Sequence, residues 1–142
     1  MRITQSYPLV QASDVAARAA FFRDWLGFRA VFEADWYVQL QSPESPEVNL
    51  AILQAGHETV PEAQRGVTRG LILTYEVEDA AREAERARAA GIRIVHPLRD
   101  EPHGQRHFIA EAPGGVLVDI VTPIPPAEGF AEGYAVTPFR PD

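Results

Sequence analysis

The sequence predicts an α+β fold made of two tandem βαβββ modules. Two observations predict this fold. The segments around Asp14 and Asp79, which lie 65 positions apart, repeat the same order of apolar strand, acidic residue and helical stretch. The glycines expected to end the two helices, Gly27 and Gly91, lie 64 positions apart. The two copies therefore differ by one residue over half the chain, as expected for a diverged duplication.

The first module is expected over residues 5–54. Its first strand leads into Asp14, whose side chain can accept hydrogen bonds from the free N–H groups of a helix start. Gly27 suits the left-handed conformation that commonly follows the last helical turn. Apolar residues recur at helical spacing on one face of this helix: Val15, Ala19, Phe22 and Leu26. Three further strands are expected, over 28–33, 36–42 and 47–54.

The second module is expected over residues 68–122, after a linker over 55–67, and both modules belong to one domain over 1–142. Its helix has a small apolar face of Ala80, Ala84 and Ala87, which predicts close packing of helix against sheet. Its later strands are expected over 92–96, 105–111 and 116–122. A proline-rich tail over 123–142 carries aromatic residues that suggest packing against another surface: Phe130, Tyr134 and Phe139.

Composition excludes several kinds of chemistry. The 142 residues include no cysteine, so thiolate catalysis, disulfides and cysteine-ligated zinc are excluded. The sequence also has no lysine, which excludes a lysine Schiff base. The net charge is −7 and no cluster of basic residues is present, so nucleic acid is not an expected partner. No apolar run suits a membrane span and no signal-peptide pattern is present, which predicts a cytoplasmic protein.

Several segments resemble the vicinal oxygen chelate superfamily, which includes glyoxalase I, extradiol dioxygenases and bleomycin-resistance proteins. The resemblance covers about residues 5–124. It rests on Ser13-Asp14-Val15 with Phe21-Phe22-Arg23-Asp24-Trp25-Leu26-Gly27-Phe28, on Glu101-Pro102-His103-Gly104-Gln105-Arg106-His107-Phe108, and on Ala112-Pro113-Gly114-Gly115-Val116-Leu117-Val118-Asp119. It implies that the two modules form a curled mixed sheet, a cup around a small molecule, and that two chains pair as a homodimer.

Enzymes of this family hold a divalent metal in the cup, with ligands from the first and last strands of each module. The first-strand positions are occupied here by Tyr7 and Ile72. The last-strand positions offer Asn49 or Ala51 in the first module and Asp119 in the second. Isoleucine and alanine cannot ligate a metal, so the prediction is that no metal and no other cofactor binds. Catalytic residues stay unassigned.

The histidines were considered as alternative ligands. His103 and His107 are four residues apart in a loop that leads into a strand, where that spacing spans ~13 Å, so joint ligation is not favoured. His107 beside Asp119 could form an acid–base pair. His57 and His96 lie near strand ends and are expected at the surface.

Strand alternation predicts which residues face the cup. Trp36 and Tyr37 add aromatic surface at the start of a strand, although Trp36 could instead alternate with Val38 and Leu40 as ordinary core. Trp25 is expected in the core or at a dimer contact. The candidate ligand-binding residues are Tyr7, Leu9, Trp36, Tyr37, Asn49, Ala51, Ile72, Thr74, His107 and Asp119.

The function predicted from these residues is that of a metal-free binding protein of the bleomycin-resistance type, which sequesters an aromatic or cationic ligand such as an antibiotic. The alternative is a metal-dependent lyase, isomerase or dioxygenase with an atypical ligand set that includes Asp119. A third possibility is an accessory protein whose tail or dimer contacts a partner enzyme.

Overall fold

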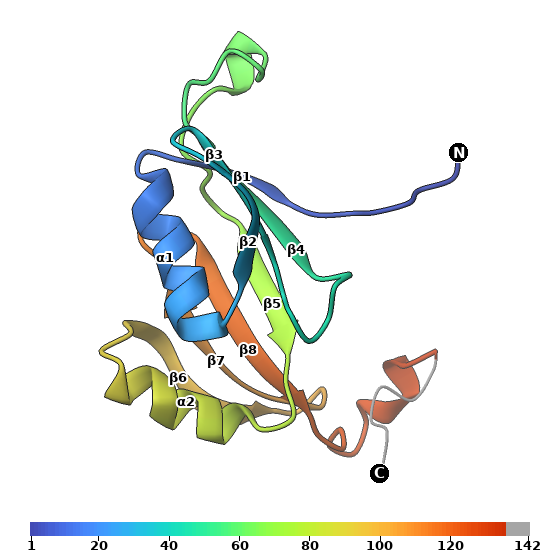
Figure 1. The fold of residues 1–142 in the computed structure, drawn as a ribbon. Coiled ribbons are helices and arrows are strands. Elements are labelled where there is room, and N and C mark those ends of the chain that lie inside the picture. Colours follow the sequence, from blue (N-terminus) through green and yellow to red (C-terminus); the bar gives the residue numbers. More distant parts are fainter. Residues whose placement is uncertain (136–142) are drawn as a thin grey trace. The chain divides into compact units, whose positions relative to one another are not determined.

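The computed structural model describes residues 1–135 and divides into two compact units, which are described separately. The first unit comprises Met1–Gly70 with Ala112–Gly115, and the second comprises Leu71–Glu111 with the residues from Val116 onward. Each unit has one α-helix and one four-stranded mixed sheet (Figure 1). The predicted α+β fold of tandem βαβββ modules is confirmed. Phe139 of the predicted tail lies outside the described residues.

The first unit contains β1 (Leu9–Ala12), α1 (Val15–Leu26), β2 (Arg29–Ala34), β3 (Tyr37–Gln41) and β4 (Asn49–Gln54). Its strand order is β1-β4-β3-β2, and β1 is parallel to β4. Asp14 caps α1, because its Oδ1 accepts the Ala17 N–H at 2.9 Å. At the other end Gly27 has a φ of 72°, and its N–H donates to the Arg23 carbonyl. Both predicted helix ends are confirmed.

The second unit contains β5 (Ile72–Glu76), α2 (Ala80–Ala89), β6 (Ile94–Glu101), β7 (Gln105–Glu111) and β8 (Leu117–Pro123). Its order β5-β8-β7-β6 repeats that of the first sheet. Asp79 Oδ1 accepts the Arg82 N–H at 3.0 Å, and the three alanines of the predicted α2 face are fully buried. Short 3-10 turns also occur at Glu62–Gln64 and Ala131–Gly133.

Strand β6 is longer than predicted, because it continues past residue 96 to Glu101. Pro97 is the reason for the wrong end point. Proline has no N–H for the ladder, but it is tolerated on edge strands and at bulges, and β6 is the edge strand of its sheet. The β6–β7 register shifts between His96 and Arg99, so the strand bulges at Pro97 and then resumes.

The buried face of α1 differs in part from the prediction. Val15, Ala19 and Phe22 are buried as expected, whereas Leu26 is only half-buried and Trp25 lies in the core. Arg18 is also buried, with 1% of its surface exposed. Its Nε donates to the Pro113 carbonyl at 2.9 Å, and burial lowers the pKa of Arg18. A charged residue can occupy this face because the backbone carbonyl partly replaces water.

Gly114 lies against the buried guanidinium and should not tolerate a side chain. A Cβ at Gly114 would lie 2.2 Å from Arg18 Nη2, whereas a Cβ at Gly115 would meet nothing within 4 Å. Both glycines have a positive φ, 86° and 93°, so alanine is strained at either position. We expect Gly114→Ala to lower the free energy of unfolding by about 1–3 kcal/mol more than Gly115→Ala, measured by urea denaturation. Equal losses would contradict the Arg18 contact.

Tyr75 should make stability fall at alkaline pH. Burial raises the pKa of Tyr75 to about 12. The folded state then keeps a proton that the unfolded chain releases near pH ~10. The contribution of Tyr75 to the free energy of unfolding is therefore complete below pH ~10 and is lost as the pH rises towards 12. We expect the free energy of unfolding of wild type to fall more between pH ~9 and ~11.5 than that of Tyr75→Phe. Parallel profiles would show that Tyr75 ionises normally.

Candidate functional site

The sheet of the first unit has an apolar pocket on the face opposite α1. Its volume is about 360 Å³. Paired residues of neighbouring strands share a face, and Tyr37 pairs with Leu53 while Leu9 pairs with Ala51. The lining comes from all four strands, from the β2–β3 turn and from the segment after β4: Leu9, Phe32, Trp36, Tyr37, Leu53 and Thr59.

Aromatic rings dominate this pocket. The ring centroids of Phe32 and Tyr37 lie 5.8 Å apart, and those of Trp36 and Tyr37 lie 5.7 Å apart. The His57 ring stacks on Trp36 at 4.5 Å with an angle of 11° between the planes. His57 Nδ1 also lies 2.9 Å from Thr59 Oγ1, which fixes the turn that carries Thr59 into the lining.

Trp36 is not ordinary core. It is 43% exposed, because it lies in the turn before β3 rather than in the strand. If Trp36 were ordinary core, it would alternate with buried Val38 and Leu40. Both of these residues are buried, but Trp36 is not. Large apolar side chains left this open to water often mark a binding surface.

The Tyr37 hydroxyl is less acidic than usual. Burial, together with the neighbouring Tyr7, raises the pKa of Tyr37.

Strand register identifies the last-strand position that the sequence left open. Leu9 and Thr74 each lie five residues before the aspartate that caps the following helix. Leu9 pairs with Ala51 and Thr74 pairs with Asp119, so Ala51, not Asn49, is the counterpart of Asp119. Asn49 pairs instead with Gln41 and donates from its side chain to the Pro46 carbonyl at 2.8 Å.

The family's usual metal positions are therefore Tyr7, Ala51, Ile72 and Asp119. Ala51 is fully buried and has no donor atom, and Ile72 is an exposed apolar side chain. Two of the four positions lack a ligand atom, and Asp119 is already hydrogen-bonded to His107. These four residues do not fit the divalent ion that the family's enzymes hold there.

The open face of the second sheet is different, since it gathers ionisable groups around His107. His107 Nδ1 lies 2.8 Å from Asp119 Oδ1, and His107 Nε2 lies 3.1 Å from Glu101 Oε1. Burial lowers the pKa of His107, but the hydrogen bonds to Asp119 and Glu101 outweigh burial and leave the pKa raised. Arg99 and His107 together lower the pKa of Glu101 to about 2. The structure places His107 beside Asp119, the contact that the sequence left open as a possible acid–base pair.

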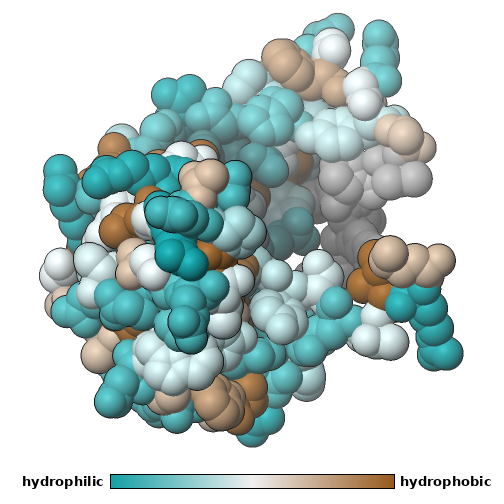
Figure 2. Space-filling model, turned by 90° about the horizontal axis from the view of Figure 1, so that it is seen from above, coloured by the Kyte–Doolittle hydropathy of each residue, from teal (hydrophilic) through white to brown (hydrophobic). Residues whose placement is uncertain are grey.

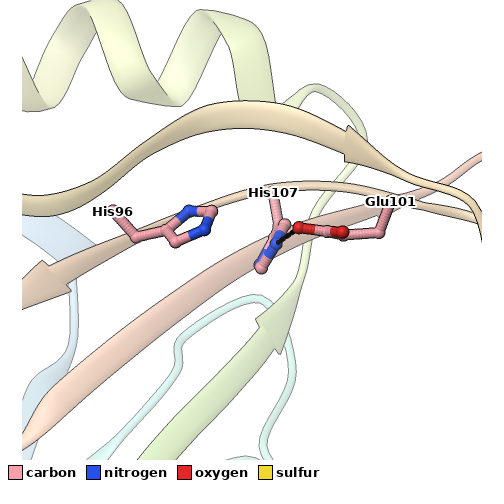
Figure 3. Close-up of side chains that lie close together, drawn as sticks. All are labelled: His96, Glu101 and His107. Carbon is pink, nitrogen blue, oxygen red and sulfur yellow. Dashed lines mark hydrogen bonds and ion pairs between the residues drawn. The ribbon is translucent and has the colours of Figure 1, made fainter.

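His96 and Glu101 join this group. His96 was expected at the surface but is half-buried, and nothing in the sequence singled out Glu101. They are five residues apart, so a regular strand would place them on opposite faces of the sheet. The bulge at Pro97 adds one residue, and His96 then pairs with Ile109 while Glu101 pairs with Gln105, on the same face as His107. Figure 3 shows all three side chains converging. Pro97 inside an apolar stretch was the signal for a bulge.

Other predicted residues belong to neither group. Ile72 and Thr74 are exposed on β5. His103 lies in an exposed turn with Nε2 3.0 Å from Gln105 Oε1, and its backbone carbonyl accepts a hydrogen bond from the Tyr134 hydroxyl. Among residues 1–135, the group with metal-ligating spacing contains His107 but not His103.

The family model for the "Glyoxalase/Bleomycin resistance protein/Dioxygenase superfamily" matches residues 4–120. The chain belongs to this superfamily. The resemblance noted in the sequence is thereby confirmed, at the level of the superfamily and not of one activity. No curated protein matches the sequence.

Several solved structures share the fold. TioX from Micromonospora sp. ML1 is 19% identical with a TM-score of 0.70, covering 85% of this chain and 99% of its own. A lactoylglutathione lyase from Agrobacterium tumefaciens is 18% identical with a TM-score of 0.68, covering 90% and 95%. A glyoxalase/bleomycin resistance protein/dioxygenase from Nocardioides is 21% identical with a TM-score of 0.71, covering 100% and 91%. Identities this low establish the fold alone.

On the face shown in Figure 2, hydrophilic and intermediate residues predominate and hydrophobic ones are scattered. Within residues 1–135, no helix combines the length and the hydropathy that crossing a bilayer requires. Scattered apolar residues are normal, whereas the exposed side chains gathered at the pocket of the first unit are not: Leu9, Phe32 and Trp36.

Proposed function

We propose that the protein binds a planar aromatic small molecule, such as an antibiotic, in the pocket of its first unit, and so sequesters it. The observation that carries this proposal is the clustering of Phe32, Trp36 and Tyr37 around an apolar pocket of about 360 Å³. This volume lies in the range of small-molecule sites, which are mostly apolar with few polar groups. Thr59 supplies a hydroxyl at the rim that can orient a ligand.

A cationic ligand suits this pocket best. Trp36 is the best aromatic partner for a cation, and it is exposed on the pocket wall. The net charge of −7 also favours the approach of cations. Stacking and cation–π contact together contribute about 1–2 kcal/mol per ring, so several rings give useful affinity without a bond to a metal.

The absence of donor atoms at Ala51 and Ile72 supports binding over the family's usual catalysis. In that chemistry a metal polarises the substrate oxygens, and it needs the ligand set that these two positions lack. Binding in the aromatic pocket needs neither a metal nor a nucleophile.

The enzyme alternative has one specific observation in its favour. His107 and Asp119 lie 2.8 Å apart on the open face of the second sheet, which is the contact a general acid–base pair requires. Metal analysis of protein purified without chelator tests it. A stoichiometric ion that is lost in Asp119→Ala but kept in His96→Ala would favour a family-type metalloenzyme.

Trp36 offers a direct test of the pocket. The chain has two tryptophans, and Trp25 is buried, so Trp25→Phe leaves Trp36 as the reporter. We expect a planar aromatic cation such as ethidium, or bleomycin itself, to quench Trp36 fluorescence saturably. Trp36→Ala should weaken binding about 10-fold, measured by calorimetry, because a ring contact worth about 1.4 kcal/mol is lost.

The matched control is Val31→Ala. It truncates an exposed apolar side chain that lies in β2 and outside the pocket lining. This variant should bind like wild type. Equal affinity of Trp36→Ala and wild type would refute the pocket as the binding site. So would a lack of quenching by every planar cationic and neutral compound tried.

A further inference from the structure

The open face of the second sheet carries three side chains with the spacing of metal ligands. One ligand atom from each of His96, Glu101 and His107 lies within 4.8 Å of the other two. All three are partly buried and converge from β6 and β7 (Figure 3). These three residues are different ones from Tyr7, Ala51 and Ile72, which occupy the positions where the family's enzymes would bind their metal.

The distances fit a small divalent ion. Ligand atoms about 2.1 Å from a tetrahedral ion are about 3.4 Å apart, and His107 Nε2 lies 3.1 Å from Glu101 Oε1. The His96 and His107 ring centroids are 5.0 Å apart, and the ligand atoms of all three residues lie within 4.8 Å of one another. Two imidazoles and one carboxylate are a common donor set for zinc and for non-haem iron.

Asp119 supplies the support that a metal-bound histidine usually has. Ligating histidines almost always donate their second ring N–H to a carboxylate or carbonyl, which fixes the tautomer and orients the ring. His107 Nδ1 lies 2.8 Å from Asp119 Oδ1, which leaves Nε2 aimed at Glu101 and the centre of the cluster. An ion between Nε2 and Glu101 would replace a proton on His107 without moving the ring.

His96 gives an independent indication of a missing partner. Its Nδ1 is shielded from solvent and has no hydrogen-bond partner among residues 1–135. A buried polar atom without a partner is costly and often marks an absent water or ion. The His96 ring lies beside the His107 ring. A metal ion would therefore give the His96 imidazole a partner that it otherwise lacks.

The charges around the cluster favour a cation. Glu101 and Asp119 contribute two carboxylates. Arg99 balances one of them through its bond from Nε to Glu101 Oε1 at 2.6 Å, and the other is balanced only while His107 holds a second proton, which a bound ion would replace. Arg99 also donates to Glu101 Oε2 at 2.9 Å, so it can stay hydrogen-bonded to Oε2 while Oε1 binds an ion.

We propose that His96, Glu101 and His107 bind a divalent transition-metal ion such as Zn²⁺, with Asp119 orienting His107.

Zinc titration of chelator-stripped protein by isothermal calorimetry tests this proposal. We expect one Zn²⁺ per chain. His96→Ala and His107→Ala should each weaken binding by about 100-fold or more, because each removes one of three ligands. His103 is exposed and lies outside the group, so it provides the matched control: His103→Ala should leave the affinity unchanged. Asp119→Asn should weaken binding about 10–100-fold, as expected for a group that supports a ligand.

Co²⁺ provides a readout of coordination itself. Its visible absorption should appear at one equivalent in wild type and in His103→Ala, and should change in intensity in Glu101→Gln. Far-UV circular dichroism shows that each variant is folded. The proposal is overturned if no stoichiometric ion binds, if His96→Ala binds like wild type, or if His103→Ala abolishes binding. None of these outcomes bears on the aromatic pocket, which Trp36 fluorescence reports separately.

Discussion

The parallel pairing of the first and last strands in each unit determines which residues share a face. β1 lies beside β4 with Leu9 opposite Ala51, and β5 lies beside β8 with Thr74 opposite Asp119. A slip of one residue would turn every side chain of a strand to the other face. The helix covers one face of each sheet and leaves the other open, so this pairing decides which side chains can form a site. Packing of α1 and α2 depends on it too, because Val10 and Leu73 reach the buried faces only in this register.

The two open faces carry different chemistry on the same scaffold. In the first unit, aromatic side chains from β2, β3 and the turn between them form an apolar pocket. In the second unit, the corresponding face holds His107 between two carboxylates. The bulge at Pro97 accounts for part of the difference, because it brings His96 and Glu101 to one face. A fold whose usual metal positions lack ligand atoms at Ala51 and Ile72 thus carries another set of ligand-type side chains on its second sheet.

Local signals predicted the elements well. Asp14, Asp79 and Gly27 lie where helix ends need a side-chain acceptor or a left-handed residue, and these requirements depend on neighbouring residues only. Strand alternation also predicted that Leu9 faces away from the helix, and Leu9 lines the pocket. Such patterns can be recognised in a single sequence because they follow from the local geometry of the backbone.

Features that depend on distant residues were not predictable in this way. Arg18 is buried because the Pro113 carbonyl, 95 positions away, accepts its hydrogen bond. Glu101 and His96 were missed because Pro97 indicated the end of a strand, whereas the pairing of β6 with β7 continues beyond it. The choice between Asn49 and Ala51 likewise required the register of β4, which turn length alone does not determine.

The central claim is that metal-binding capacity in this chain resides around His107 and not at the family's usual positions. Anomalous X-ray diffraction from zinc-soaked crystals, recorded on both sides of the zinc absorption edge, tests it most directly. The account predicts one strong peak within about 2.0–2.2 Å of ligand atoms from His96, Glu101 and His107. A peak bonded to Asp119 without His96 and His107, or no ordered peak at saturating zinc, would contradict it.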